Sequence, residues 1–227
     1  MATAKSTSTS STILKKHKQV EFHDKYKILL EDAIDLDKKI IYLFDELQDN
    51  IGTILRVKYA ALKLYWEEVK NKKFNDIIVD ISSFGGSVYA IYAALDFYDE
   101  LKNEDNVLVN TKAQGICMSA ATVLLSGGTG IRTATKRCKF MLHDMQISDI
   151  SGSATQVAKQ METIKIEQEE LFAFYAQYTR KKGTSELTGV VLKKETKKWM
   201  DRFASNSMEH FISAKEALEL GLCDRII

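Results

Sequence analysis

Ser119 and His143 are the two side chains of this sequence whose types and positions suit covalent chemistry. Ser119 stands in the small-residue segment AQGICMSAATVLLSGG (113–128), where a buried hydroxyl needs either a hydrogen-bond partner or a function. His143 ends the apolar run KFMLHD, and two glycines, Gly85 and Gly86, follow another apolar run in DISSFGGS. A nucleophilic hydroxyl, an imidazole base and backbone N–H donors for an oxyanion are the set that acyl transfer needs.

Each of these features also has a purely structural interpretation. A pair of glycines after a strand often serves only as a turn, and this pair is too short for a phosphate-binding loop. A serine among small residues is commonly a tolerated polar group, and the GxSxG pattern of α/β-hydrolases is absent. A lone histidine at a strand end is more often structural than reactive. The residues alone leave the catalytic and the structural interpretations open.

The hydrophobic pattern indicates strands that alternate with helices. Short apolar runs at 39–44, 76–81 and 106–113 predict strands, and apolar residues at helical spacing predict the helices between them. Ser119 is expected where a short helix follows a strand, a place with exposed N–H groups. A long amphipathic helix is predicted at 153–180, with an apolar surface suited to a subunit interface. The alternation predicts an α/β fold with a largely parallel sheet.

The composition is that of an ordinary soluble globular protein. The chain has 227 residues, 45% of them apolar and 28% charged, with a net charge of +1, so neither nucleic acid nor a membrane is an expected partner. Three cysteines without CxxC spacing indicate reduced thiols and a cytoplasmic protein, with an organellar or virus-associated location left open. Residues 1–25, basic and rich in Ser and Thr, are predicted as a disordered or flexible tail, with a transit peptide as the alternative. Residues 26–227 are predicted to form one domain.

Over residues 26–227 the sequence resembles the ClpP family, the proteolytic subunits of ATP-dependent Clp proteases, which share the ClpP/crotonase fold. DIIVDISSFGGSVYAIYAALDFYDEL is similar to the family's strand, SPGG turn and helix. GICMSAATVLLSGG and KFMLHD resemble the segments that hold its nucleophile and its histidine. SGSATQV looks like the start of its handle helix, and FISAKEALELGLCDRII follows its C-terminal motif. The motifs keep the family's order and approximate spacing, so together they are more specific than any one of them.

The resemblance implies an α/β, ClpP/crotonase-like fold with a parallel-sheet core and a projecting handle helix. It implies Ser119 as nucleophile, His143 as general base, and the backbone N–H groups of Gly86 and Ala120 as the oxyanion hole. The implied activity is that of a serine endopeptidase that cleaves unfolded polypeptides through an acyl-enzyme. It would act inside a homo-oligomer of heptameric rings stacked as a tetradecamer, which a Clp-type AAA+ unfoldase feeds. No metal or organic cofactor is implied, and the chain lacks the GxxxxGK[ST] loop that would bind ATP.

The third member of the catalytic triad is unknown from the sequence. Counting back without gaps from the C-terminal motif puts Ser205 in the place of the family's aspartate, with Asn206 adjacent. Asp201 lies one helical turn earlier, and Asp144 is expected on the strand face opposite to His143. A neutral residue in this role orients the histidine without stabilising its charged form.

Further departures leave other functions open. Phe84 replaces the proline of the SPGG turn, and the segment around 180–198 holds extra residues. The missing aspartate motivates one alternative, a catalytically weak or inactive ClpP-like subunit with a structural or regulatory role in the ring. A crotonase-type acyl-CoA enzyme, which uses the same oxyanion geometry, is a weaker alternative because of the Ser/His pair. A virus-encoded relative that processes capsid proteins is compatible with the divergent motifs.

Overall fold

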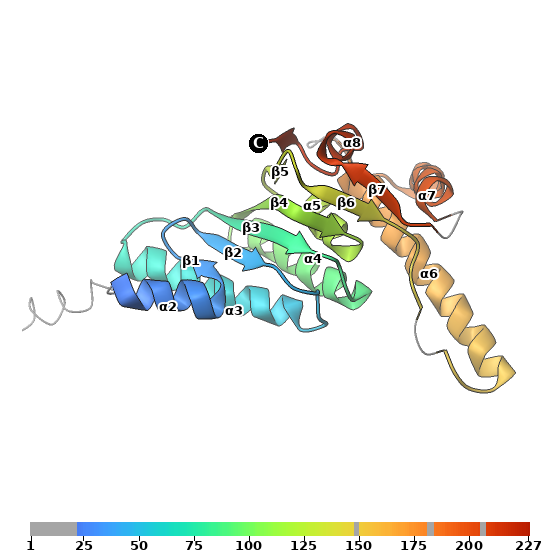
Figure 1. Cartoon of the computed structure of the whole chain (residues 1–227), viewed down its shortest axis with the longest axis horizontal. Helices are drawn as coiled ribbons and strands as arrows, with labels where there is room; N and C mark the ends of the chain where they lie inside the picture. The colour runs from blue at the N-terminus through green and yellow to red at the C-terminus, as the bar shows by residue number, and fades with distance from the viewer. Residues whose placement is uncertain (1–21, 148–149, 181–183, 205–207) are drawn as a thin grey trace, which may run out of the picture.

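The residues that the computed structural model describes are 22–147, 150–180, 184–204 and 208–227 (Figure 1). Most of the predicted tail, residues 1–25, lies outside these ranges, and helix α2 (Phe22–Asp32) overlaps its last residues. Within the described ranges, no helix combines the length and the apolar character that crossing a membrane requires.

One mixed sheet forms the centre of the fold. Its strands are β1 (Ile34–Asp35), β2 (Ile40–Leu43), β3 (Asp76–Ser83), β4 (Leu108–Met118), β5 (Arg132–Ala134), β6 (Lys139–Leu142), β7 (His210–Ser213) and β8 (Arg225–Ile226). The order across the sheet is β1-β2-β3-β4-β5-β8, and β6 pairs with the end of β4 and, on its other edge, with β7. The pairs β1–β2 and β6–β7 are antiparallel and the other pairs are parallel. The predicted α/β fold with a largely parallel sheet is confirmed.

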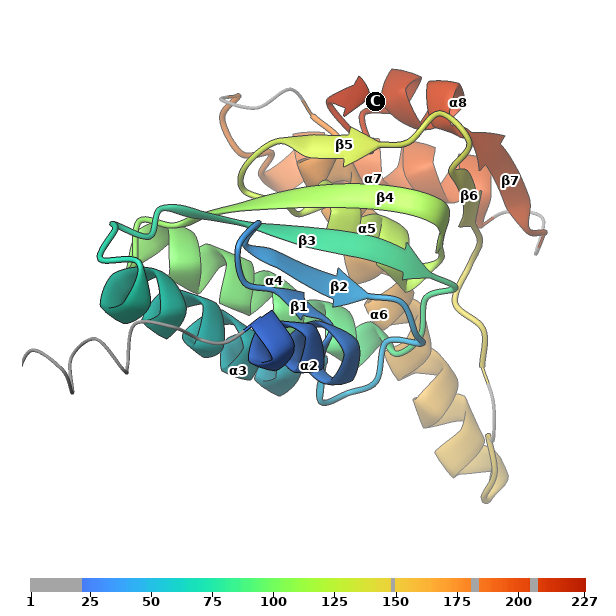
Figure 2. The same ribbon diagram turned by 60° about the vertical axis from the view of Figure 1, so that its left-hand side comes forward.

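The central strands bury one face of the sheet against helices. Ile77, Val79 and Ile81 of β3 alternate along the strand and have no exposed surface. Burying a side chain of this size stabilises the fold by about 1.5–3 kcal/mol. The helices that lie on this face are α3 (Ile51–Leu64), which continues as a π-helix (Tyr65–Val69), α4 (Val88–Asn103) and α5 (Ala120–Ser126) (Figure 2). They hold β3 and β4 in place, and the Gly85–Gly86 turn and Ser119 follow the ends of these strands.

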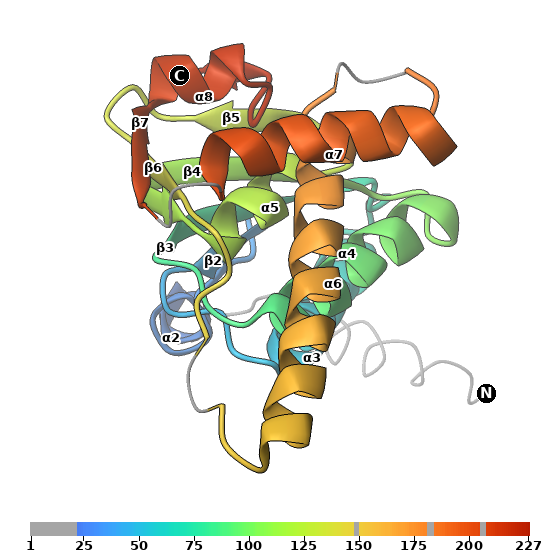
Figure 3. The same cartoon turned by 90° about the vertical axis from the view of Figure 1, so that its right-hand side faces the viewer.

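Helix α6 (Ala154–Tyr178) projects from the body of the protein (Figures 1 and 3). It begins with a capping box, in which the side chains of Ser153 and Gln156 each accept a hydrogen bond from the other's backbone N–H. The C-terminal part of the helix is buried in the body and packs against α7 (Gly189–Phe203). Much of the segment identified as extra relative to the family thus forms a helix that supports α6. The short helix α8 (Ala214–Glu219) then leads to the C-terminal strand.

Candidate active site

Ser119 stands at the junction between β4 and α5 in a strained backbone conformation. Its φ of +50° and ψ of −130° lie in a region that residues other than glycine rarely adopt. Its N–H donates a hydrogen bond of 2.8 Å to the carbonyl oxygen of Met141, and its hydroxyl makes no capping bond to α5. Strain of this kind is concentrated at functional sites, where the surrounding structure imposes it. The geometry therefore favours a functional serine over a tolerated one.

His143 emerges beside Ser119 at the same edge of the sheet. Strand β6 runs parallel to the end of β4, with Met118 paired to Met141, and the two strands stop almost together. Because the carboxyl ends of parallel strands meet at one edge, the residues that follow them share that edge. Ser119 and His143 both line a cavity of about 430 Å³. The two residues that the sequence singled out are therefore brought together.

The Gly85–Gly86 turn packs directly against Ser119. Both glycines have a positive φ, +104° and +147°. A Cβ atom on Gly85 would stand 2.7 Å from the Cβ of Ser119 and 3.1 Å from the backbone nitrogen of Ala120. A side chain on Gly85 is therefore excluded by contact as well as by backbone conformation.

Two backbone N–H groups at this point suit the oxyanion role. Leu47 N–H donates to Gly85 O, and Ser87 N–H donates to Leu47 O, at 2.8 and 2.9 Å. The Gly86 N–H between these two bonds has no partner among the described residues. Ala120 opens α5, so its N–H precedes the hydrogen-bond ladder of the helix. Gly86 and Ala120 both line the cavity with Ser119.

Replacing Gly86 with alanine is expected to lower kcat for peptide hydrolysis by about 100- to 1,000-fold, the effect of losing one oxyanion donor. The new Cβ would lie 2.3 Å from the carbonyl oxygen of Leu47, so the turn and its N–H must move. Gly189→Ala is the matched control, because Gly189 also has a positive φ, +53°, but has no atom within 4 Å of its Cβ position. Steady-state kinetics on both variants checks the expectation. Unchanged kcat in Gly86→Ala excludes the Gly86 N–H as an oxyanion donor.

The structure places Glu209, which the sequence did not single out, at the same cavity as His143. Strand β7 is antiparallel to β6, and Leu142 pairs with His210. The next position of this register sets His143 opposite Glu209, and both residues line the cavity. The Nδ1 atom of His143 is buried and has no hydrogen-bond partner among the described residues. In a serine protease triad a carboxylate bonded to this atom orients the imidazole, and in this structure no carboxylate of the described residues reaches it.

The other candidates for the third position have a weaker basis. Ser205 and Asn206 lie outside the described residues. Asp201 is exposed on α7 and does not line the cavity that holds Ser119 and His143. Asp144 lines the cavity together with His143, contrary to the expectation that it would face away. Strand β6 ends at Leu142, so the alternation of a strand does not apply to Asp144.

The remainder of the cavity has a mixed polar and apolar lining. Apolar side chains of α4, α6 and β6 line it, together with the acidic residues Glu46, Asp144 and Glu209. Phe84, in place of the family's proline, also lines it and is 71% exposed. The proline is thus not needed for the positive φ angles of the two glycines. A cavity with both apolar side chains and polar groups can bind an extended peptide through its side chains and its backbone.

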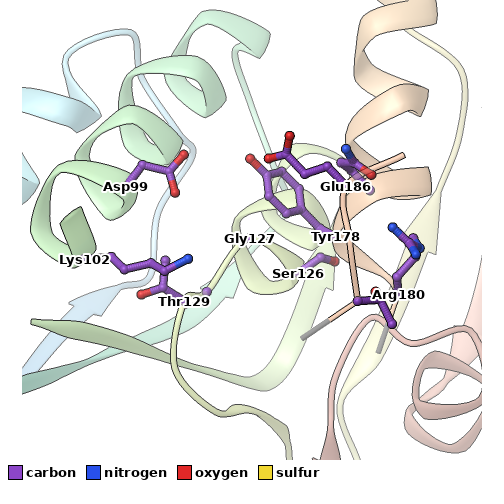
Figure 4. Close-up of a pocket in the computed structure, with 11 residues that line it drawn as sticks. Asp99, Lys102, Ser126, Gly127, Thr129, Tyr178, Arg180 and Glu186 are labelled. Carbon is purple, nitrogen blue, oxygen red and sulfur yellow. The ribbon is translucent and has the colours of Figure 1, made fainter. Parts of the chain in front are cut away.

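A second cavity lies away from these residues, at the C-terminal ends of α4, α5 and α6 (Figure 4). It has a volume of about 280 Å³ and contains charged groups of both signs, among them Asp99, Lys102 and Arg180. Neither Ser119 nor His143 lines it. The cavity around Ser119 is therefore the candidate active site.

A serine at a strained strand-to-helix junction, with a histidine and free N–H donors at one edge of a parallel sheet, is typical of a serine hydrolase that works by acyl transfer. Comparison with known proteins narrows this class. A family model described as Clp protease matches residues 26–227. The chain belongs to the Clp protease family, as its motifs predicted, and is a ClpP-like serine-type endopeptidase.

Curated relatives agree with the family model. The ATP-dependent Clp protease proteolytic subunit 2 of Prochlorococcus marinus is 32% identical over 191 residues, which cover 84% of this chain and 82% of the relative. Subunit 1 of Mycobacterium leprae is 29% identical over 198 residues, covering 85% and 83%. Subunit 1 of Shouchella clausii is 28% identical over 207 residues, or 90% of each chain. These relatives favour the protease over the acyl-CoA enzyme, and they do not favour the weakly active subunit.

Proposed function

We propose that the chain is the proteolytic subunit of an ATP-dependent protease, and that it cleaves unfolded polypeptides with Ser119, His143 and Glu209 as its catalytic triad. The observation that carries the proposal is the meeting of strained Ser119, His143 and the Gly85–Gly86 turn at one cavity. Two observations support Glu209 as the third member. The register of β6 and β7 sets it opposite His143, and the Nδ1 atom of His143 has no hydrogen-bond partner among the described residues.

The proposed reaction has two steps, acylation and deacylation. Ser119 Oγ attacks the peptide carbonyl while His143 Nε2 takes the hydroxyl proton, and the N–H groups of Gly86 and Ala120 bind the oxyanion. His143 then gives that proton to the leaving amine, which leaves an acyl-enzyme ester on Ser119. Water, activated by the same imidazole, releases the peptide acid and restores the serine.

The active assembly is proposed to be a homo-oligomer, heptameric rings stacked as a tetradecamer, served by a Clp-type AAA+ unfoldase. The relatives are named as proteolytic subunits of an ATP-dependent protease, which supports a separate ATPase partner. The projecting part of α6 supports contact with further copies, because Val157, Met161 and Ile164 form an apolar stripe at helical spacing on it. The proposed compartment is the cytoplasm.

Labelling with a fluorophosphonate tests the proposal on the assembled protein. These reagents phosphonylate serine hydroxyls that a base and an oxyanion hole activate, so we expect one adduct per chain. Peptide mapping by mass spectrometry should place it on Ser119, and the heat-denatured chain should show none. An assembled ring without any adduct supports the weakly active subunit, and an adduct on another serine contradicts the assignment of Ser119.

A further inference from the structure

Two buried hydroxyls hold the backbone carbonyl of Ser119, that of Thr122 directly and that of Tyr175 mainly through Thr122. Thr122 donates to this oxygen twice, from its backbone N–H at 2.9 Å and from its Oγ1 at 2.7 Å. The Tyr175 hydroxyl lies 2.6 Å from Thr122 Oγ1 and 3.5 Å from the same carbonyl oxygen. Thr122 comes from α5 and Tyr175 from α6, so the contact joins two helices at the nucleophile.

Each hydroxyl has one proton to donate, and this decides which oxygen is the donor in each of these hydrogen bonds. The one hydroxyl proton of Thr122 goes to the Ser119 carbonyl, so Thr122 Oγ1 accepts from Tyr175. Burial raises the pKa of Tyr175, which keeps its phenol protonated and able to donate. Thr122 is fully buried and Tyr175 is 3% exposed, so water does not compete for these bonds.

The carbonyl that they hold belongs to the peptide unit whose N–H is the Ala120 oxyanion donor. A trans peptide is planar, and its C=O and N–H point in opposite directions. Fixing the oxygen of Ser119 therefore fixes the direction of the Ala120 N–H. A change in ψ of Ser119 would relax the strained backbone and turn this N–H away, and the two hydroxyls oppose that change.

The ring of Tyr175 is positioned independently of its hydroxyl. It stacks on Trp199 of α7 with centroids 5.1 Å apart and planes at 14°, and it packs against Phe172 at 5.7 Å. Removing the hydroxyl alone should leave the ring in place, because these aromatic contacts remain.

We propose that Thr122 and Tyr175 are positioning residues that hold the Ser119–Ala120 peptide so that its N–H meets the developing oxyanion. The proposal rests on the proposed function, in which Ser119 is the nucleophile and Ala120 an oxyanion donor. Neither hydroxyl touches the reacting atoms. Their contribution is orientation, and it appears only when charge develops on the substrate oxygen.

The test compares Thr122→Val and Tyr175→Phe with the parent chain in the assembled enzyme. Each variant removes one hydroxyl with little change of shape. We expect kcat per active site to fall about 10- to 100-fold, less than for outright loss of an oxyanion donor, with KM unchanged. The inhibition constant of a peptide boronate, whose tetrahedral adduct fills the oxyanion hole, should rise by a similar factor. Affinity for the corresponding peptide amide should stay the same.

Two further variants separate positioning from a general packing effect. Thr122→Ser keeps the hydroxyl and should restore most of kcat relative to Thr122→Val. Tyr98→Phe removes another fully buried tyrosine hydroxyl, one without a hydrogen-bond partner among the described residues, and should leave kcat and boronate affinity unchanged. End-point fluorophosphonate titration supplies the number of active sites, so that misfolded chains are not counted.

Unchanged kcat per site in both hydroxyl variants overturns the proposal, as does a loss that lies wholly in the number of titratable sites. A fall in kcat with unaltered boronate affinity also overturns it, because the effect would then lie outside the oxyanion interaction. A different result would contradict the proposed function itself. If a Ser119→Ala variant kept full activity, Ser119 would not be the nucleophile, whatever the two hydroxyls do.

Discussion

Ser119→Ala is expected to lower kcat for peptide hydrolysis on the order of a millionfold, to the level of residual catalysis by substrate binding and the oxyanion donors. Without the hydroxyl no acyl-enzyme can form. The substitution should not disturb the fold, because the side chain makes no capping bond to α5 and alanine has the same Cβ. Size-exclusion chromatography and kinetics with a fluorogenic peptide measure assembly and activity on one sample.

Ser151→Ala is the matched control for this experiment. Ser151 lies exposed in the loop before α6 and does not line the cavity. It should retain full activity and full fluorophosphonate labelling, while Ser119→Ala should show neither. Labelling that persists in a correctly assembled Ser119→Ala variant means that another residue is the nucleophile.

Glu209→Gln is expected to lower kcat on the order of 10,000-fold, the effect of neutralising the acid of a serine protease triad. Glutamine keeps the shape of the side chain but lacks the negative charge that stabilises a protonated imidazole. Glu209 is exposed, so the exchange should cost little folding stability. Glu209→Asp, which retains the charge on a side chain one methylene shorter, should keep more activity than Glu209→Gln. Initial rates at saturating peptide measure the effect.

Asp144→Asn serves as the control for charge in the cavity. Asp144 also lines it, but Glu209 is the residue that the β6–β7 register sets opposite His143. A small effect of Asp144→Asn beside a large effect of Glu209→Gln identifies Glu209 as the acid. The reverse result would assign that role to Asp144. Small effects in both would point to a histidine that works without a carboxylate from this cavity.

Local pattern in the sequence was sufficient for most of the fold. The apolar run at 39–44 contains β2, and the helical spacing after the glycine pair corresponds to α4. The spacing of apolar residues along a segment shows which of its faces is buried. In a parallel α/β fold, each helix or strand buries one face or both, so this spacing identifies most of the elements. The alternation of strands and helices also predicts that the carboxyl ends of the strands lie at one edge of the sheet. Ser119 and His143 each follow a strand, so they could be expected close together at that edge.

Glu209 could not be found in this way, because its place depends on contacts between distant parts of the chain. Strand β7 has only four residues, and its pairing with β6 joins segments about 70 positions apart, as the pair of Leu142 with His210 illustrates. Register of this kind is set by packing and by turn geometry, which a short run does not encode. Counting along the sequence led to Ser205 instead. The available signal was a carboxylate immediately before a short apolar run that could pair with KFML.

The contacts of the segment with extra residues could also be found only from the structure. In the sequence it is only a departure from the family's pattern, with no role indicated. In the structure α7 places Trp199 against Tyr175, whose hydroxyl lies 3.5 Å from the carbonyl oxygen of Ser119. Helix α7, which begins in this segment and extends beyond it to Trp199, therefore forms part of the packing around Ser119.

The backbone of Ser119 also has a consequence for stability. A non-glycine residue in this region destabilises the folded state by about 1–3 kcal/mol. The net free energy of unfolding of a domain is only about 5–15 kcal/mol, so the strain at this one residue is a substantial fraction of it. Glycine would relieve the strain, but it has no hydroxyl to attack a peptide. At position 119 thermodynamic stability and reactivity are in opposition, and chains selected only for heat resistance would be expected to lose this serine first.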